Sequence, residues 1–292
     1  MSSEYIPSWW LHSDDSWQEL EVYFRESYKI KNIDELKKEE CWKIISDGRS
    51  NHSYCLSLKS TRFFVQITNR SNKIYLPYER IILLKNILNG NAYKELLPWL
   101  VNTYFQSENL KIQDWFESQT LSPKLNSDDA TIDLLAKFLA NLHSHNPEEL
   151  SAFDLKKHLI KYRDIALRNK KNSLVKQNIL DRFEKAITAL SSYVPSSLCH
   201  YDLNLNNILF DNDKKIMKII DWEYVCIGDP ILDLTALVNN LELSKQHERY
   251  FICRYKVHST SKSVYRQDIG AKKISDMKLL NECIYDLWEY GQ

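Results

Sequence analysis

Two stretches in the first third of the chain are rich in apolar residues, and the second alternates between its two faces with a period of two. They read "SYCLSL" at 53–58 and "RFFVQIT" at 62–68, with a short polar turn between them. Phe63, Val65 and Ile67 fall on one face of the second stretch. Such alternation is typical of a strand with one buried face. We therefore predict two neighbouring strands between residues 53 and 68.

Apolar residues at helical spacing dominate most of the remaining chain. Residues 14–40 are charged and amphipathic and predict one or two helices, and "PYERIILLKNIL" at 77–88 predicts another. The pattern "SDDATIDLLAKFLANLHSH" at 127–145 has cap candidates at Ser127 and Asp128, followed by an apolar stripe. Two more helices are predicted over "SLVKQNILDRFEKAITAL" at 173–190 and "GDPILDLTALVNNL" at 228–241.

A small hairpin interrupts this helical part. The apolar stretches "NILF" and "IMKIID" are joined by "DNDKK", whose residue types favour a tight turn. The order is therefore strands and one helix, then helices with a hairpin between them, which predicts an α+β fold with two lobes. We expect residues 1–115 to form the first lobe, with a helical extension over 1–40, and residues 116–292 to form the second.

Composition narrows the class of protein. Of the 292 residues 43% are hydrophobic and 12% aromatic, which indicates a folded globular chain. Lys and Arg number 39, as do Asp and Glu, and this balance argues against a general nucleic-acid binder. Six scattered cysteines without zinc-type spacing predict free thiols in a reducing compartment. With no secretory pattern at the start and no apolar run of about 18 residues, we expect no membrane span and a cytoplasmic protein.

Candidate chemistry is concentrated in "HYDLNLNNILFDNDKKIMKIIDWEY" at 200–224. It places His200, Asp202 and Asn207 in the pattern H-x-D-x-x-x-x-N, and Asp221 at the end of the strand that follows. A carboxylate buried without a partner is costly, so a cation is expected among these side chains. Phosphoryl transfer needs a carboxylate that accepts the proton of the attacking hydroxyl, together with oxygen ligands for Mg²⁺. We predict the first role for Asp202 and the second for Asn207 and Asp221.

This region resembles the aminoglycoside phosphotransferase and choline/ethanolamine/thiamine kinase superfamily, whose members are relatives of protein kinases. The pieces that carry the resemblance are "HYDLNLNNIL", "IIDWEY" and "GDPILDL", in order and at family-like spacing. The resemblance is closest to bacterial choline and thiamine kinases. It implies a protein-kinase-like fold with a small β-rich N-terminal lobe and a larger, mainly helical C-terminal lobe. It also implies ATP and Mg²⁺ as cofactors.

Upstream, the resemblance is looser and implies nucleotide contacts. Gly48, Ser50 and Asn51 stand in a turn that would cover the phosphates, and Glu79 stands on the helix that faces the nucleotide lobe. Adenine would contact the backbone near Asp114, Trp115 and Phe116.

One departure from the family pattern concerns the strand at 62–68. The family carries a lysine or arginine there that binds the phosphates, and this chain has Gln66. A neutral amide donates hydrogen bonds without charge, and charge-assisted bonds are about twice as strong. Arg62, Arg70 or Lys73 could substitute; otherwise the chain binds nucleotide weakly or is a degenerate kinase.

Several other residues have both a functional and a structural interpretation. Trp222, Glu223 and Asp229 are candidates for the acceptor pocket, although the tryptophan could be core and Asp229 a helix cap. For His200 we expect hydrogen bonding that supports the loop, and for Asp233 a brace beneath it.

The leading hypothesis is an ATP-dependent kinase that phosphorylates a hydroxyl of a choline- or thiamine-like alcohol. A cationic acceptor would suit a pocket with Trp222 and Glu223 through cation–π and ion-pair contacts. An aminoglycoside phosphotransferase, a non-catalytic kinase-shaped binding protein and a protein-directed kinase are the alternatives. The sequence indicates neither the identity of the acceptor nor the oligomeric state.

Overall fold

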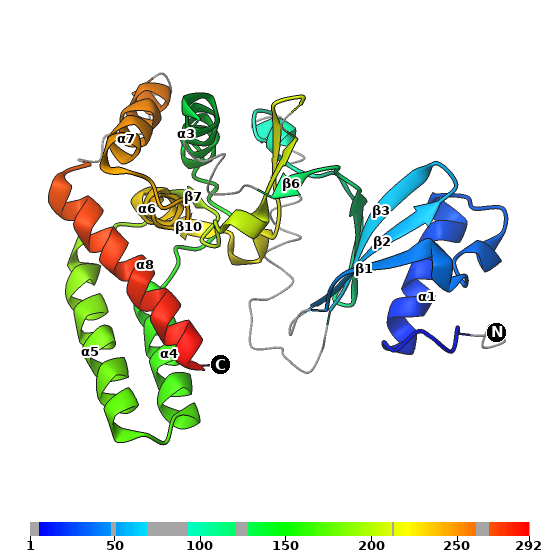
Figure 1. Ribbon diagram of the computed structural model, residues 1–292, viewed down its shortest axis with the longest axis horizontal. Helices are drawn as coiled ribbons and strands as arrows, with labels where there is room; N and C mark the ends of the chain where they lie inside the picture. Colours follow the sequence, from blue (N-terminus) through cyan, green and yellow to red (C-terminus); the bar gives the residue numbers. More distant parts are fainter. Residues whose placement is uncertain are drawn as a thin grey trace. The chain divides into compact units, whose positions relative to one another are not determined.

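The computed structural model describes residues 6–47, 51–68, 93–120, 128–211, 213–260 and 269–291. The chain divides into two compact units, each of which is described by itself (Figure 1). The first unit takes Met1–Tyr78 and Leu100–Ser118, and the second takes Glu79–Trp99 and Gln119–Gln292.

The first unit is built on a five-stranded antiparallel sheet in the order β1-β2-β3-β5-β4. Its strands are β1 (Trp42–Asp47), β2 (Asn51–Leu58), β3 (Thr61–Thr68), β4 (Thr103–Gln106) and β5 (Leu110–Asp114). The two strands predicted between residues 53 and 68 are thus confirmed as β2 and β3. They are joined at Lys59, whose φ of 56° is left-handed, as a tight turn requires.

One face of this sheet forms the core of the unit. Phe63, Val65 and Ile67 are 1%, 0% and 2% exposed, so the predicted alternation is confirmed. They pack with residues of the same sheet and of the N-terminal segment, namely Leu56, Leu58, Leu110, Ile112, Trp17, Leu20 and Phe24. Burial of large apolar side chains of the sheet and of the N-terminal segment contributes most of the stability of this core.

The N-terminal segment is helical only in part. Helix α1 (Asp14–Val22) begins after Ser13, whose side chain accepts from the Ser16 N–H. It continues into the π-helical turn η1 (Tyr23–Ser27), and the short 3₁₀ turns η2 (Ile33–Glu35) and η3 (Glu39–Cys41) follow. The tryptophan-rich start of the chain packs edge-on against this helix, with the rings of Trp10 and Trp17 5.0 Å apart. Aromatic pairs favour this geometry.

The second unit is mainly helical. Its helices are α3 (Asp129–His143), α4 (Leu155–Asn169), α5 (Ser173–Ala189), α6 (Pro230–Asn240), α7 (Lys245–Thr260) and α8 (Ala271–Gly291). Helix α8 packs against α4, α5 and α6, while α3 packs against α7 (Figure 1). The predicted helices at 127–145, 173–190 and 228–241 are confirmed, with Asp128 as the cap of α3. The helix predicted at 77–88 lies outside the described residues, as does Ser127.

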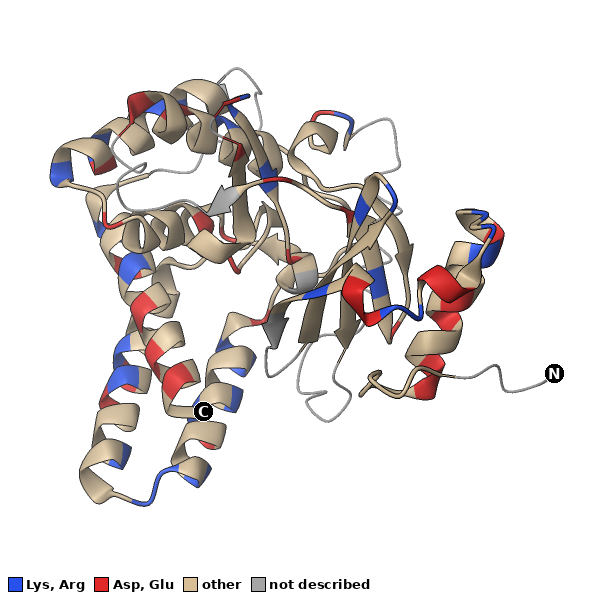
Figure 2. Ribbon diagram, turned by 45° about the vertical axis from the view of Figure 1, so that its right-hand side comes forward, with Lys and Arg blue, Asp and Glu red and all other residues tan. Residues whose placement is uncertain are grey.

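Short strands complete the second unit and carry the predicted hairpin. β8 (Ile208–Asp211) pairs with β9 (Ile216–Ile219) and with β6 (Gln119–Thr120), while β7 (Ser197–Cys199) pairs with β10 (Cys226–Gly228). All six cysteines are free thiols. Among the described helices, none has the length and apolar character needed to cross a membrane. Acidic and basic residues are interspersed along the helices (Figure 2), in keeping with the absence of net charge.

Candidate active site

The loop at 200–207 leaves β7 through an unusual backbone conformation. Tyr201 has a φ of 62°, in the left-handed region that a bulky residue rarely adopts. The loop then closes with the 3₁₀ turn η9 (Leu205–Asn207), which leads directly into β8. Such strain persists only where surrounding contacts hold it, and it is concentrated at functional sites.

Within the loop, Asp202 and Asn207 contact each other directly. Asn207 Nδ2 donates to the Asp202 carboxylate oxygen Oδ2 and to the Asp202 carbonyl, each at 2.8 Å. Asn204 Nδ2 donates to the other carboxylate oxygen, Oδ1, at 3.1 Å. Because Nδ2 of Asn207 is turned toward Asp202, the amide oxygen Oδ1 is the atom that could face a cation.

Asp221 joins this pair from the far side of the hairpin. The Ile220 N–H donates to the Asn207 carbonyl at 3.0 Å, so the residue before Asp221 is fixed to the end of the loop. Asp221 itself lies two residues beyond β9 and has a left-handed φ of 63°, whereas the sequence predicts it as the last residue of the strand. The left-handed conformation redirects the chain at this carboxylate, two residues after the strand has ended.

The pKa of Asp202 is shifted by its burial and by the nearby carboxylate of Asp221. Burial raises its pKa from the ordinary 3.8 to about 7, and the negative charge of Asp221 is the next cause. The hydrogen bonds from Asn204 and Asn207 lower the pKa and oppose that rise only in part. A carboxylate that titrates near neutrality is well suited to accept a proton from a hydroxyl.

Beneath the loop, Asp233 of α6 accepts two backbone hydrogen bonds from it. Its Oδ2 accepts from the His200 N–H at 2.7 Å, and its Oδ1 accepts from the Tyr201 N–H at 2.9 Å. Asp233 is 1% exposed, so this bracing is internal, in agreement with the sequence expectation. The two bonds hold Tyr201 in its left-handed conformation.

His200 supports the loop by hydrogen bonding, again as expected. Its Nε2 donates to the Ile220 carbonyl at 2.9 Å, and its Nδ1 accepts from the Asp202 N–H at 3.2 Å. Burial lowers the pKa of this imidazole, which keeps the ring neutral. One tautomer therefore links the loop at 200–207 to the residue before Asp221.

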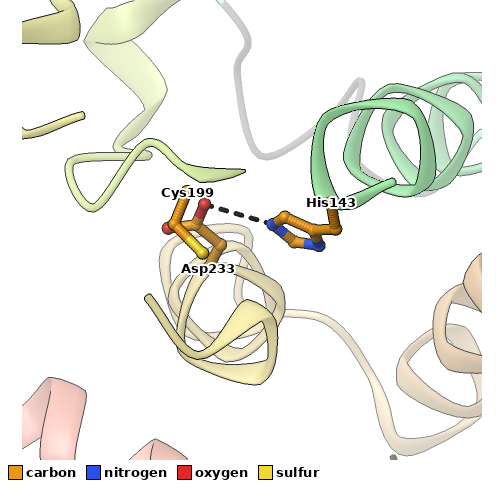
Figure 3. A group of neighbouring side chains, drawn as sticks. All are labelled: His143, Cys199 and Asp233. Atoms are coloured by element: carbon orange, nitrogen blue, oxygen red, sulfur yellow. Dashed lines mark hydrogen bonds and ion pairs between the residues drawn. The ribbon is translucent and has the colours of Figure 1, made fainter. Parts of the chain in front are cut away.

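His143, Cys199 and Asp233 form a buried cluster at the same place (Figure 3). His143 Nε2 contacts Asp233 Oδ2 at 3.3 Å, and His143 Nδ1 contacts the Tyr255 hydroxyl at 2.9 Å. Both imidazole nitrogens and both carboxylate oxygens thus have protein partners, and burial raises the pKa of the Cys199 thiol well above its usual range. This chemistry favours a structural cluster over a metal centre. The histidine that ends α3 was visible in the sequence, but its contact with Asp233, 90 residues away, was not.

Gly228 touches the same loop and allows a specific test. A Cβ built on this glycine would lie 2.2 Å from the Tyr201 hydroxyl oxygen, which itself accepts from the Asp229 N–H at 2.7 Å. We expect Gly228→Ala to lower the free energy of unfolding by about 1–3 kcal/mol through overpacking, measured by urea denaturation. Gly291→Ala is the matched control, because its Cβ would meet only Ile165 at 3.4 Å. Equal stability of the two variants would contradict this account.

The residues predicted for nucleotide binding lie partly within the described chain. Asn51 begins β2, Gln66 lies in β3, and Asp114 ends β5, where its carboxylate accepts from the Tyr104 hydroxyl. Trp115 and Phe116 follow directly and are half-buried. Gly48, Ser50 and Glu79 lie outside the described residues, so their roles remain predictions.

Of the residues predicted for the acceptor, Trp222 lies beside the loop. Its ring centroid is 4.5 Å from that of His200, and its Nε1 donates to the Ile219 carbonyl at 3.0 Å. The side chain of Glu223 lies outside the described part. Asp229 is not available to an acceptor, contrary to one of the two interpretations above. It is 0% exposed and caps α6, and its Oδ2 accepts from the Val194 N–H and pairs with Lys273, each at 2.7 Å.

Comparison with known proteins places this arrangement in a family. A model of the phosphotransferase enzyme family matches residues 42–251. The chain belongs to the phosphotransferase enzyme family. Membership in this family makes the chain a phosphotransferase, as the loop residues predict.

Sequence relatives of the phosphotransferase are distant. Protein LicA of Haemophilus influenzae is 21% identical over 243 residues, which cover 82% of this chain and 88% of that protein. An uncharacterized protein of Metamycoplasma hominis is 29% identical over 186 residues, which cover 62% of this chain but 36% of that protein. The chain thus matches about a third of the length of the second relative.

Solved structures resemble the phosphotransferase over almost its whole length. Choline kinase LicA from Streptococcus pneumoniae has a TM-score of 0.69 at 19% identity, covering 92% of this chain and 89% of that one. A structure of LicA in complex with AMP has a TM-score of 0.66 at 21% identity, covering 91% and 89%. The predicted protein-kinase-like α+β fold, with a β-rich N-terminal part and a mainly helical C-terminal part, is confirmed.

Proposed function

We propose that this phosphotransferase is an ATP-dependent kinase that transfers the γ-phosphate to a hydroxyl of a choline- or thiamine-like alcohol. The observation that carries the proposal is the loop at 200–207, where Asp202 titrates near neutrality within reach of Asn207 and Asp221. A choline kinase among the structures of similar fold supports the choice of acceptor class, and an AMP complex supports the nucleotide.

In this proposal each residue of the loop has a separate role. Asp202 orients the acceptor hydroxyl and takes its proton as the new phosphorus–oxygen bond forms and the bond to the leaving ADP breaks. His200 and Asp233 hold the loop so that the carboxylate points in one direction. Because Asp202 is hydrogen bonded at both oxygens, its orientation is fixed before the acceptor binds.

The side chains present also fit a magnesium ion. Asp221 raises the pKa of Asp202, so two carboxylates lie close enough to repel each other, and a cation would relieve that repulsion. Carboxylate and amide oxygens are the ligands Mg²⁺ prefers. Asp221 and the Oδ1 of Asn207 would hold the ion, which when bound neutralises charge on the nucleotide phosphates. Gly48, Ser50 and Asn51 would cover those phosphates, Glu79 would face the nucleotide, and the backbone at 114–116 would bind adenine.

The acceptor is proposed to be cationic. Trp222 lies next to His200 of the loop, and an aromatic ring there with Glu223 would attract an ammonium group by cation–π and ion-pair contacts. Gln66 is the observation that favours the alternative, a kinase-shaped protein that binds without catalysis, because it brings no charge to the phosphates.

An acceptor screen tests the function. We expect ADP release by the purified chain with Mg-ATP and choline, ethanolamine or thiamine, and less or none with aminoglycosides or a protein acceptor. Because a ligand that binds only the folded state stabilises it, Mg-ATP at 100 times its Kd should add about 2.7 kcal/mol to the unfolding free energy. In Asp221→Ala, we expect turnover to need far higher Mg²⁺ concentrations. No stabilisation by millimolar Mg-ATP and no ADP release with any acceptor would overturn the proposal.

A further inference from the structure

The sheet of the first unit has a second face, opposite the core, on which Gln66 lies. Its neighbours on this face follow from the register, because residues directly opposite each other in an antiparallel pair have side chains on the same side. In β2 the partner of Gln66 is Ser53, and in β5 it is Lys111. The face that carries Phe63, Val65 and Ile67 is apolar. The opposite face carries the amide of Gln66, the hydroxyl of Ser53 and the ammonium group of Lys111.

Among the described residues of this sheet, Lys111 is the cation closest to Gln66 by the register. Cβ atoms of directly opposed residues lie about 5 Å apart. The Lys111 Nζ lies 6.0 Å from the centroid of the Phe64 ring, which belongs to the same face of β3. The ammonium group therefore lies over the face that carries Gln66, and its flexible four-carbon stem lets it reorient along that face.

The other described cations on this face are less well placed. Arg62 is four residues from Gln66 along β3, about 13 Å at 3.3 Å per residue. It also forms an ion pair with Glu117 and lies over the Trp115 ring, 5.8 Å from its centroid. Lys43 of β1 pairs with Cys55 of β2, so it lies two strands away from β3, about 10 Å.

A kinase needs a positive charge near the phosphates of its nucleotide. In protein kinases a lysine on the third strand supplies it, and a neutral amide cannot make the charge-assisted bond. We propose that Lys111 supplies, from β5, the charge that Gln66 lacks on β3, so that the two side chains together bind the nucleotide phosphates. This inference rests on the proposed function, since it needs a phosphorylated nucleotide on this face.

Titration of two ligands tests the role of Lys111. We expect Lys111→Met to raise the Kd for ATP at least tenfold and to leave the Kd for adenosine within twofold, because only the phosphates would lose a partner. Lys38→Met is the matched control, an exposed lysine of the same unit on the N-terminal segment, and should leave both values unchanged. In the exchange variant Gln66→Lys with Lys111→Met, ATP affinity should return to within threefold of wild type.

The outcomes separate this inference from the function itself. Equal loss of ATP and adenosine affinity in Lys111→Met, or ATP affinity equal to wild type, would overturn the role of Lys111 even if the wild-type protein is an active kinase. If the wild-type protein binds ATP but phosphorylates no acceptor, selective loss of ATP affinity in Lys111→Met still supports the role, and only the proposed transfer fails. A wild-type protein that does not bind ATP at all overturns both.

Discussion

Replacing Asp202 by asparagine is expected to lower kcat by about 10²–10⁴, the range that a positioned general base contributes. The amide keeps the size of the carboxylate and one of its two acceptor oxygens, but it cannot take a proton from the acceptor. The variant should still bind ATP. Steady-state turnover with a saturating acceptor measures the change, and turnover at the wild-type rate would remove Asp202 from its role. Asp181→Asn, at an exposed aspartate of α5, is the control and should leave kcat unchanged.

The same substitution should increase stability at neutral pH. The pKa of Asp202 is about 7 in the folded chain and near its ordinary 3.8 in the unfolded chain. As the pH rises from 4 to 7, the unfolded chain releases this proton while the folded chain retains it, so the unfolding free energy falls. Asp202→Asn has no such proton to lose, so its stability does not fall in this way. In urea denaturation, its unfolding free energy should exceed that of wild type by more at pH 8 than at pH 4. In wild type, kcat/KM for ATP, which reports the free enzyme, should fall as the pH drops below about 7.

Replacing Asp233 by alanine is expected to have the second largest effect. It leaves the N–H groups of His200 and Tyr201 buried without an acceptor and removes a contact of His143. Each unsatisfied buried donor costs about 1–3 kcal/mol, so the free energy of unfolding should fall by about 2–6 kcal/mol. The left-handed conformation of Tyr201 also loses its support, and kcat should fall although Asp233 does not contact the acceptor.

A graded comparison keeps that prediction testable if the alanine variant does not fold. Asp233→Asn retains one acceptor oxygen and should lose less stability than Asp233→Ala. Asp181→Ala, at the exposed aspartate of α5, should change the unfolding free energy by less than about 0.5 kcal/mol. An alanine variant as stable as wild type would show that the two backbone bonds do not brace the loop.

Local patterns predicted much of this structure, and contacts distant in sequence explain what they missed. Apolar stretches around a polar turn, with period-two alternation in the second, identified β2 and β3. A capping aspartate identified the start of α3. Both signals reside in a few neighbouring residues. Strands β4 and β5 were not predicted, since their four and five residues show no clear period and lack a turn such as the "DNDKK" that identified β8 and β9. The partner of Gln66 therefore could not be identified as Lys111, 45 positions later.

In the candidate site too, some features were visible in the local sequence and others were not. The spacing of Asp202, Asn207 and Asp221 was visible in the sequence, and the hairpin explains how the three converge. The burial of Asp229 was not visible, because its partner Lys273 comes from another helix. The backbone turn at Asp221 also escaped prediction, since an aspartate at the end of an apolar stretch does not reveal its φ.

The close approach of Tyr201 to Gly228 links two positions that are 27 residues apart. A side chain at 228 has room only if the ring at 201 is absent, and a smaller residue at 201 leaves the Asp229 N–H without its hydroxyl acceptor. Evolution can therefore alter either position only with a matching change at the other. In relatives of this chain, the two should covary, with glycine at the second wherever an aromatic residue occupies the first.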